Sequence, residues 1–323
     1  MLFHLLVGAS GAWLARRYAL RRNLVDQPGE RRSHSVPTPR SGGIGIVAAV
    51  LAGGGVLLLR HDAAPVLGFA LTGFAVVAGI GLADDHRSLS PWLRLGVQAL
   101  AAGLLAFGAW FTWHDAWLSL MAFGLAMVLT NVWNFMDGID GIAASQAMFV
   151  SMAIAISGFA GWITWVAAGL LAACLGFLPF NFPKARLFLG DVGSGAIGFL
   201  LAALLVSVLA SAGRGTWAMG LLLPSAFLID ASLTLGGRLL RGEPWWRPHA
   251  LHAYQRWARR TGSHVPVTLA YAAWTALACL LALLLRGQEY FVMLAASVTW
   301  YIAGAAIWWM LQVKGMRAVE DRE

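Results

Sequence analysis

The sequence predicts an all-α integral membrane protein that crosses the bilayer about eleven times, and three observations support this fold class. The 323 residues are 59% hydrophobic and only 12% charged, whereas a soluble domain of this size is about one quarter charged. The apolar residues gather into runs that are long enough to cross a bilayer. The basic residues gather into every second connection between those runs, which is the charge pattern that sets membrane topology.

Each apolar run is expected to form one transmembrane helix. The runs lie near residues 2–20, 43–59, 65–82, 95–111, 117–133, 142–158, 161–180, 195–211, 217–236, 267–285 and 291–311. The uncharged stretch 142–182 is too long for a single crossing. Its SGFAG segment (157–161) is therefore expected to bend the chain and to separate two spans.

The orientation in the membrane follows from the basic residues. Twenty of the 23 lysines and arginines lie in the connections 16–41, 83–94, 180–194, 237–266 and 312–323. This asymmetry places those connections and the C-terminus in the cytoplasm, and eleven spans then place the N-terminus outside. The net charge of +8 therefore faces the cytoplasm, where it favours anionic lipid or a phosphorylated substrate rather than nucleic acid.

The whole chain is expected to form one domain whose chemistry lies in its cytoplasmic loops. We place these loops at 21–42, 83–94, 134–141, 181–194 and 237–266. In the second of them, the pair Asp84–Asp85 is a natural site for Mg²⁺ or for a diphosphate bound through it. Adjacent carboxylates also raise each other's pKa, which suits a proton acceptor. The alternative is an acidic turn that caps a helix.

Four polar residues gather where the fifth span ends. The stretch NVWNFMDGIDG (131–141) contains Asn131, Asn134, Asp137 and Asp140. A continuing helix would stack the first three of them along one side. Polar groups beside a membrane span are costly and commonly mark a functional site. The alternative is a polar helix end with glycine caps.

The loop before the eighth span and the last long loop add a glycine turn and paired histidines. GDVGSG (190–195) is expected to open a helix whose free N–H groups bind an anion such as phosphate, with Lys184 nearby. His249 and His252 follow Arg247 and lie three residues apart, on one helical face, where they could bind a metal, a phosphate or a proton. The alternative for this segment is an amphipathic helix at the lipid surface.

Two further charges have open interpretations. Arg40 follows Arg31, Arg32 and His34 in the first long loop. This group is a candidate clamp for a phosphate or a lipid headgroup, although charge beside a membrane more often only sets topology. Asp230 lies inside the ninth span, where a carboxylate is either a functional residue or a hydrogen-bonded structural one.

Read in order along the chain, these motifs resemble the polyprenyl-phosphate N-acetylhexosamine-1-phosphate transferase superfamily. Its members include the phospho-MurNAc-pentapeptide translocase of peptidoglycan synthesis and the enzymes that start O-antigen chains. The matching stretches are VPTPRSGG (36–43), DDHRSLSPWLRLGVQ (84–98), NVWNFMDGIDGIA (131–143), FPKARLFLGDVGSG (182–195) and RPHALH (247–252). The resemblance implies transfer of a sugar 1-phosphate from a UDP-sugar to undecaprenyl phosphate, with release of UMP, at the cytoplasmic face of the inner (plasma) membrane. It also implies Mg²⁺ as the cofactor, with Mn²⁺ as a substitute.

The resemblance implies roles for individual residues. Asp191 would bind Mg²⁺, Asp84 would act as a base for the lipid phosphate, and Asp85 would orient it or share the metal. Phe188 matches an aromatic residue that packs on the uracil ring. The catalytic set is then Asp84, Asp85, Asp137, His249 and His252; the metal set is Asp191 and Asp85; the substrate-binding set is Asn131, Asn134, Asp140, Lys184, Phe188, Arg40 and Arg247.

The motifs depart from the translocase branch at two places. The histidine loop reads PHALH and HRS follows the acidic pair, where that branch has three adjacent histidines and a lysine. These differences argue against a muramoyl-pentapeptide substrate and favour the O-antigen-initiating branch, with an N-acetylated amino- or deoxy-sugar. The sequence leaves open the exact sugar, the choice between direct transfer and a covalent aspartyl intermediate, and whether the protein is a homodimer. A rival function is an ion- or proton-coupled transporter, whose essential groups would lie near the bilayer midplane, as Asp230 does.

Overall fold

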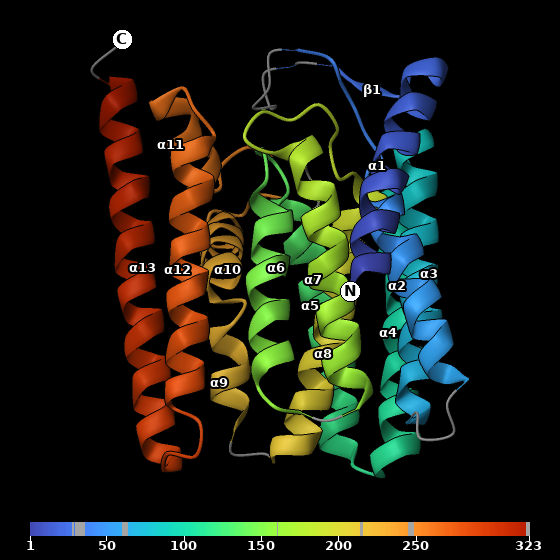
Figure 1. Ribbon diagram of the computed structural model, residues 1–323. Helices are drawn as coiled ribbons and strands as arrows, with labels where there is room; N and C mark the ends of the chain where they lie inside the picture. Colours follow the sequence, from blue (N-terminus) through green and yellow to red (C-terminus); the bar gives the residue numbers. More distant parts are fainter. Residues whose placement is uncertain are drawn as a thin grey trace.

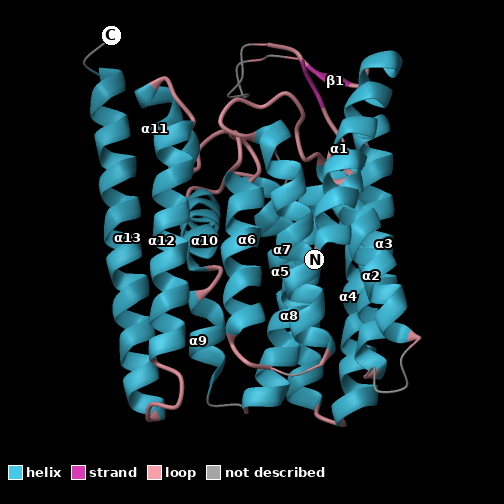
Figure 2. Ribbon diagram, in the orientation of Figure 1, coloured by secondary structure: helices cyan, strands magenta, loops and turns pink. Residues whose placement is uncertain are grey.

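The computed structural model describes residues 1–27, 29, 36–59, 64–159, 161–213, 216–244 and 249–320. Helices dominate this part of the chain (Figures 1 and 2). They are α1 (Leu2–Arg22), α2 (Ile44–Leu58), α3 (Pro65–His86), α4 (Pro91–Trp113), α5 (Ala116–Met136), α6 (Ile142–Ile156), α7 (Trp162–Asn181), α8 (Asp191–Ala212), α9 (Trp217–Leu222), α10 (Ser225–Leu240), α11 (Ala253–Thr261), α12 (Val265–Leu284) and α13 (Tyr290–Glu320). Two short strands, β1 (Val25–Asp26) and β2 (Thr38–Pro39), pair antiparallel with Val25 opposite Pro39.

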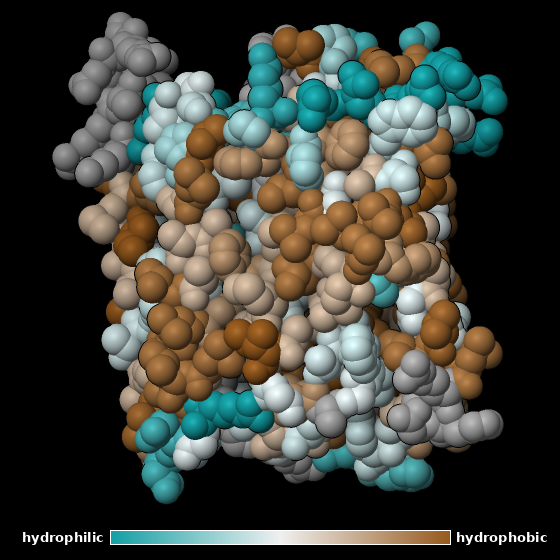
Figure 3. Space-filling model, in the orientation of Figure 1, coloured by the Kyte–Doolittle hydropathy of each residue, from teal (hydrophilic) through white to brown (hydrophobic). Residues whose placement is uncertain are grey.

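Seven of the described helices are long and apolar enough to cross a membrane, namely α3, α4, α5, α7, α8, α12 and residues 290–313 of α13. Two shorter apolar helices, α2 and α6, accompany them. In Figure 3 a broad apolar band lies between two polar ends of the molecule, as expected for a protein that sits in a bilayer. The prediction of a helical, multi-pass membrane protein is thereby confirmed, while the count of eleven spans and the orientation of the termini stay predictions.

The ninth expected span (217–236) is not one helix. The structure divides it into α9 and α10, with the break at Leu223 and Pro224. Proline has no N–H to donate and its ring collides with the preceding turn, so a helix interior rarely tolerates it. α10 begins just after Pro224 and carries Asp230 one and a half turns later.

α8 is the central helix of the bundle, and almost all of its apolar stretch is buried. It packs against α3 and α5, and small residues allow the close approach. A Cβ atom on Gly198 would collide with the backbone of Leu129 in α5, and one on Gly81 would collide with the carbonyl group of Asp191. The polar residues at the N-terminal end of α8 are therefore held directly against α3.

The longer connections lie at one end of the bundle. Figure 1 shows β1, α11 and the C-terminus at the same end, and the helices α3 and α5 also finish there. The backbone of 40–43 pairs with the loop before α8, because Gly42 and Gly43 donate to the carbonyl oxygens of Phe188 and Leu189 at 2.9 and 2.8 Å. The motif VPTPRSGG is thus fixed beside the glycine turn of the eighth span.

Candidate functional site

The centre of the candidate site is a group of charged and amide side chains around Arg94. α4 begins at Pro91, after Ser90 has capped it by accepting from the N–H of Leu93, and this places Arg94 in its first turn. The guanidinium donates to Asp84 Oδ2 at 2.7 Å and to Asn134 Oδ1 at 3.1 Å. Its Nη1 also lies 3.3 Å from Asp191 Oδ2. One cation therefore connects α3, α5 and α8.

Asp191 and Asn134 complete this group from two helices. The Asn134 amide donates to Asp191 Oδ1 at 2.8 Å and to the Ser194 hydroxyl at 3.2 Å. Asp84 is held on its other side by the N–H of Leu89, 2.7 Å from Oδ1. The structure thus brings together three residues that the sequence assigned to the site, Asp84, Asn134 and Asp191.

Asp85 has a different position from its neighbour. Its carboxylate is buried and accepts from the N–H groups of Asp191 (3.0 Å) and Val192 (3.4 Å) and from the hydroxyl of Ser41 (2.9 Å). It therefore caps the N-terminus of α8, as a carboxylate at the positive end of a helix should. The helix-capping alternative describes the arrangement, and the metal role expected for Asp85 stays a prediction.

The glycine turn is not the open anion site that its pattern predicts. The first two N–H groups of α8 are taken by Asp85, and those of Gly193 and Ser194 bond to the carbonyl oxygen of Gly190 at 3.0 Å each. Gly190 itself has φ +76°, and a Cβ atom there would lie 2.5 Å from Asp85 Oδ2. The turn therefore needs glycine to bring Asp191 and Asp85 together, and its N–H groups are already hydrogen-bonded.

Asp137 ends α5 and lies close to the same carboxylates. Burial raises the pKa of Asp137 to about 8, and the negative charges of Asp191, Asp85 and Asp140 raise it further in the same direction. A carboxyl group in this state holds a proton at neutral pH until a cation or a basic group offsets the local negative charge. Asn131 lies six residues earlier in α5, where its amide donates to Gln98 Oε1 at 3.0 Å and is held against α4.

A polar pocket of about 320 Å³ lies beside this group. It is lined by Val36, Thr38, Asp140, Pro183, Lys184, Ala185, Phe188, Gly262, Ser263, His264 and Val265. It brings together three residues that the sequence assigned to substrate binding, Asp140, Lys184 and Phe188. It also contains His264, whose Nδ1 lies 3.2 Å from Asp140 Oδ1 and accepts from the Asp140 N–H at 3.3 Å. This size is at the lower end of the range for small-ligand pockets.

Arg40 lies near the acidic pair Asp84–Asp85. It is close enough to Asp84 and Asp85 to interact with both electrostatically. Its Nε is buried and has no hydrogen-bond partner among the described residues. A buried donor without a partner is costly, so Arg40 has unused capacity to bind an anion.

The histidine loop leads directly into α11, which begins at Ala253. The rings of His249 and His252 lie 4.9 Å apart, and the ring of His252 stacks on that of Tyr254 at 5.8 Å. Burial lowers the pKa of His249 to about 4, and the positive potential of His252 and Arg238 adds to this, so His249 is neutral at pH 7. Arg247, like Arg31, Arg32 and His34, lies outside the described residues.

The donor set around Asp191 fits a magnesium ion that is bound together with a substrate. No three His, Cys, Asp or Glu side chains within the described ranges gather closely enough to hold a metal by themselves. Mg²⁺ prefers oxygen ligands and is commonly held by one or two carboxylates, with waters and substrate phosphates completing its shell. Asp191 and Asp84 are such carboxylates, and Arg94 now neutralises them.

The sequence missed three residues of this site: Arg94, Ser194 and His264. Arg94 had a readable signal, because it is a lone charge in the first turn of an apolar helix, inside a motif that had been singled out. Ser194 was visible only as part of the glycine turn. His264 carries no sequence signal, because its partner Asp140 is 124 residues away in the chain.

Comparison with known proteins finds a family and several relatives. The model of the family described as glycosyl transferase family 4 matches residues 67–209. The chain is 30% identical over 302 residues to a decaprenyl-phosphate N-acetylglucosaminephosphotransferase of Mycobacterium leprae. The aligned region covers 79% of this chain and 75% of the relative. It is 28% identical over 263 residues to a probable undecaprenyl-phosphate N-acetylglucosaminyl 1-phosphate transferase of Bacillus subtilis (75% and 72%). A phospho-N-acetylmuramoyl-pentapeptide-transferase of Heliobacterium modesticaldum is 28% identical over 224 residues (60% and 69%).

Proposed function

The chain belongs to glycosyl transferase family 4, and on this premise we propose that it transfers an N-acetylhexosamine 1-phosphate from a UDP-sugar to undecaprenyl phosphate. A lipid phosphate oxygen forms a bond to the sugar-bearing phosphorus of the UDP-sugar. The bond between that phosphorus and the bridging oxygen breaks, and UMP leaves with the electron pair. The products are UMP and a lipid-linked sugar diphosphate.

The group around Arg94 is the observation that supports this function most. Both substrates are anions, so their negative charges must be offset before they can approach each other. Arg94 presents a planar cation to Asp84 and Asp191, and the same fork suits bidentate contact with a phosphate. We infer that Arg94 exchanges these carboxylates for a substrate phosphate.

Asp84 then acts on the acceptor. Its Oδ1 stays fixed by the Leu89 N–H, while Oδ2 is released when Arg94 turns to the phosphate. The free oxygen accepts the proton of the lipid phosphate or holds that phosphate in line for attack. This direct transfer needs one alignment of two anionic groups, whereas a covalent aspartyl intermediate would need two.

Magnesium is the proposed cofactor, and Asp191 would hold it together with substrate phosphates; when bound, it supplies positive charge to the transferring and leaving phosphates. Mn²⁺ is expected to substitute. The role of Asp85 is then to hold Asp191 in place through the first turn of α8. Asn134 fixes the Asp191 carboxylate from the opposite side.

The polar pocket beside Asp140 is the proposed nucleotide site. Phe188 offers an aromatic surface for the base and Lys184 a charge for the phosphates. Arg40 adds an Nε that has no hydrogen-bond partner in the described part of the chain, and Arg247 and Asn131 complete the proposed substrate set. His249 and His252 would contact the diphosphate and the sugar.

The finer assignments are also proposals. N-Acetylglucosamine is the first sugar to test, because the names of two of the relatives contain it. The reaction would be the first membrane step of a cell-surface polysaccharide such as O-antigen, with the site on the cytoplasmic face of the inner membrane. A homodimer remains an expectation. The transporter alternative weakens, because both oxygens of Asp230 are engaged in hydrogen bonds.

The test uses the purified full chain, undecaprenyl phosphate, Mg²⁺ and a panel of UDP-N-acetyl sugars, with UMP release as the readout. UMP should form only when lipid and metal are both present, and Asp191→Asn should abolish it. UMP release without lipid would indicate hydrolysis instead. No UMP with any sugar, from protein that still binds UMP, would overturn the proposal.

A further inference from the structure

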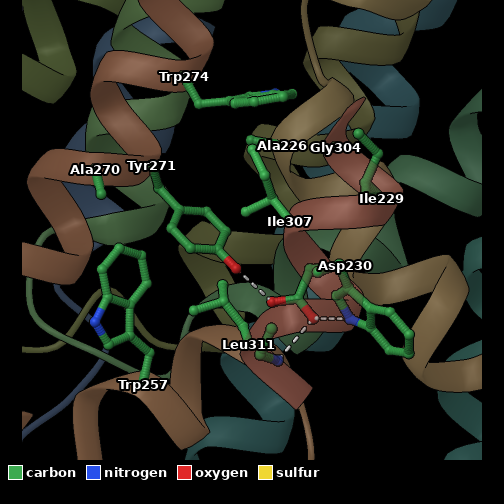
Figure 4. A pocket seen from close by; sticks show the side chains of 12 residues that line it. Ala226, Ile229, Asp230, Trp257, Ala270, Tyr271, Trp274, Gly304, Ile307 and Leu311 are labelled. Atoms are coloured by element: carbon green, nitrogen blue, oxygen red, sulfur yellow. Dashed lines mark hydrogen bonds between the residues drawn. The ribbon is translucent and has the colours of Figure 1, made fainter. Parts of the chain in front are cut away.

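Asp230 is a buried carboxylate that receives five hydrogen bonds from four helices. Oδ1 accepts from the N–H of Ala253 at 2.8 Å, from Thr234 Oγ1 at 3.1 Å and from Trp308 Nε1 at 3.2 Å. Oδ2 accepts from Tyr271 Oη at 2.7 Å and from the N–H of Tyr254 at 3.1 Å. Figure 4 shows the Tyr271 hydroxyl pointing at the carboxylate. Five donors fill the acceptor capacity of an ionised carboxylate, so no oxygen is left for a transported ion.

Two of these donors belong to the first turn of α11. The N–H groups of Ala253 and Tyr254 have no partner inside their own helix, because the first four N–H groups of any helix lack one. Asp230, which is 23 residues away in the chain, caps them. Its negative charge also lies at the positive end of the helix. α11 therefore begins where α10 holds it.

The anchored turn carries the histidine loop. His252 immediately precedes Ala253 and is buried, with its Nδ1 3.6 Å from Asp230 Oδ1 and its ring against that of His249. The distance of 3.6 Å is longer than a hydrogen bond, so His252 lies beside the carboxylate without bonding to it. The His252 side chain also caps α11, because it accepts from the backbone N–H of Gln255.

The same turn also reaches the loop that contains Asp137. Tyr254 donates its hydroxyl to the carbonyl oxygen of Phe135 at 3.0 Å. Gly138 leaves the space that this requires, because a Cβ atom there would collide with the Tyr254 hydroxyl. A continuous set of contacts thus runs from Asp230 through α11 to the residues on both sides of Asp137.

We propose that Asp230 is a positioning residue, which holds Tyr254, His249 and His252 against the Asp137 loop. It does not contact substrate. Tyr271 of α12 and Trp308 of α13 donate hydrogen bonds to the carboxylate. Both also line an apolar pocket of about 230 Å³ between α10, α11, α12 and α13. The last two helices of the chain thereby help to hold the histidine loop in position relative to Asp137, which follows α5.

The first experiment replaces Asp230 with asparagine in the full chain and measures the reactivity of His252. Asparagine keeps the shape of the side chain but replaces one acceptor oxygen with an NH₂ group. That group cannot accept the hydrogen bonds of the donors that point at it. Diethyl pyrocarbonate acylates accessible histidines, and peptide mass spectrometry locates the label. His252 should label about fivefold or more faster in Asp230→Asn, because loss of the cap frees the loop. Ser297→Ala, a buried hydroxyl removed from α13, is the matched control and should leave the labelling unchanged.

The second experiment measures kinetics, and it rests on the proposed function. Asp230→Asn should lower kcat by about 100-fold, because a misplacement of about 1 Å can have that effect. KM for the UDP-sugar should change by less than about threefold, since the nucleotide pocket is separate. Tyr254→Phe should lower kcat by about tenfold while His252 stays protected, because only the contact with Phe135 is lost.

The outcomes separate this inference from the proposed function. Slow labelling of His252 together with wild-type kcat in folded Asp230→Asn would overturn the inference. An inactive wild-type chain would overturn the proposed function, and the labelling result would still decide the inference. If Asp230→Asn does not fold, Tyr271→Phe removes one donor of the five. Tyr271→Phe should then label at His252 faster than the wild type, by less than the fivefold expected for Asp230→Asn. An unchanged labelling rate would refute the positioning role.

Discussion

Replacement of Arg94 by methionine tests the central contact of the site. The side chain keeps its apolar stem and loses its charge, so Asp84 and Asp191 lose their shared cation. Removing one partner of a fully buried pair costs about 3–5 kcal/mol. The three side chains here are 10%, 31% and 26% exposed, for Asp84, Asp191 and Arg94, so solvent screens part of this effect. We expect a loss of about 1–2 kcal/mol in the free energy of unfolding.

The assay is thermal unfolding in detergent, with and without Mg²⁺. A loss of that size lowers Tm by about 2–8 °C in a chain of 150 residues or more. Mg²⁺ should raise the Tm of Arg94→Met more than that of the wild type, because the ion no longer competes with the guanidinium. Activity should fall by about 100-fold or more, as for loss of a charge that stabilises a transition state.

Arg87→Met is the matched control, since Arg87 is exposed in the loop before α4. Exposed substitutions of this kind change stability by less than about 0.5 kcal/mol. If Arg94→Met kept the wild-type Tm without metal and gained no extra stability from Mg²⁺, the carboxylates would not depend on Arg94, and the reasoning would be wrong.

Three further variants test neighbouring contacts. Asp137→Asn should be more stable than the wild type without divalent cations, and the Tm difference should grow as pH rises from about 4 to 8. The reason is that the folded state keeps the Asp137 proton up to a pKa of about 8 while the unfolded state loses it near 4; a constant difference across this window would contradict the assignment. Gly190→Ala should lose about 1–3 kcal/mol and most activity, because φ is +76° and the new methyl group meets Asp85. Gly287→Ala, with φ +79° and open space, isolates the backbone contribution, and an equal loss there would exclude the collision. Phe188→Ala should raise KM for the UDP-sugar by about tenfold with a smaller change in kcat, since base stacking contributes about 1–3 kcal/mol; an unchanged KM would remove Phe188 from the nucleotide site.

The helices were predictable because the signal for them is local. The expected spans lie on helices in the structure, apart from the span at 217–236, which is divided between α9 and α10; a long apolar run is a local signal for a helix in a membrane. The break before α10 was also readable, because Pro224 lies in the middle of an expected span. It was missed because the apolar run continues through the proline without interruption.

The sequence predicted which residues belong to the site better than it predicted which residues contact one another. Asp84, Asn134 and Asp191 were expected together, because the charge pattern places the loops that contain them on one side of the membrane. Their shared partner Arg94 was not expected, since Arg94 is 40 residues from Asn134 and 97 from Asp191 along the chain. Sequence spacing gives the helical face of a residue, whereas only the packing of α4 against α5 and α8 brings these faces into contact.

The N-terminus of α8 shows why residue type and available hydrogen bonds must be considered together. A glycine turn that opens a helix normally offers N–H groups to a phosphate. Here the anion at that position is Asp85, supplied by the protein itself and fixed by Ser41. A substrate diphosphate must therefore find its positive charge in side chains and in a bound cation. On the proposed function, Arg94 and Arg40 are the side chains that supply this charge, and the Arg40 Nε has no hydrogen-bond partner among the described residues.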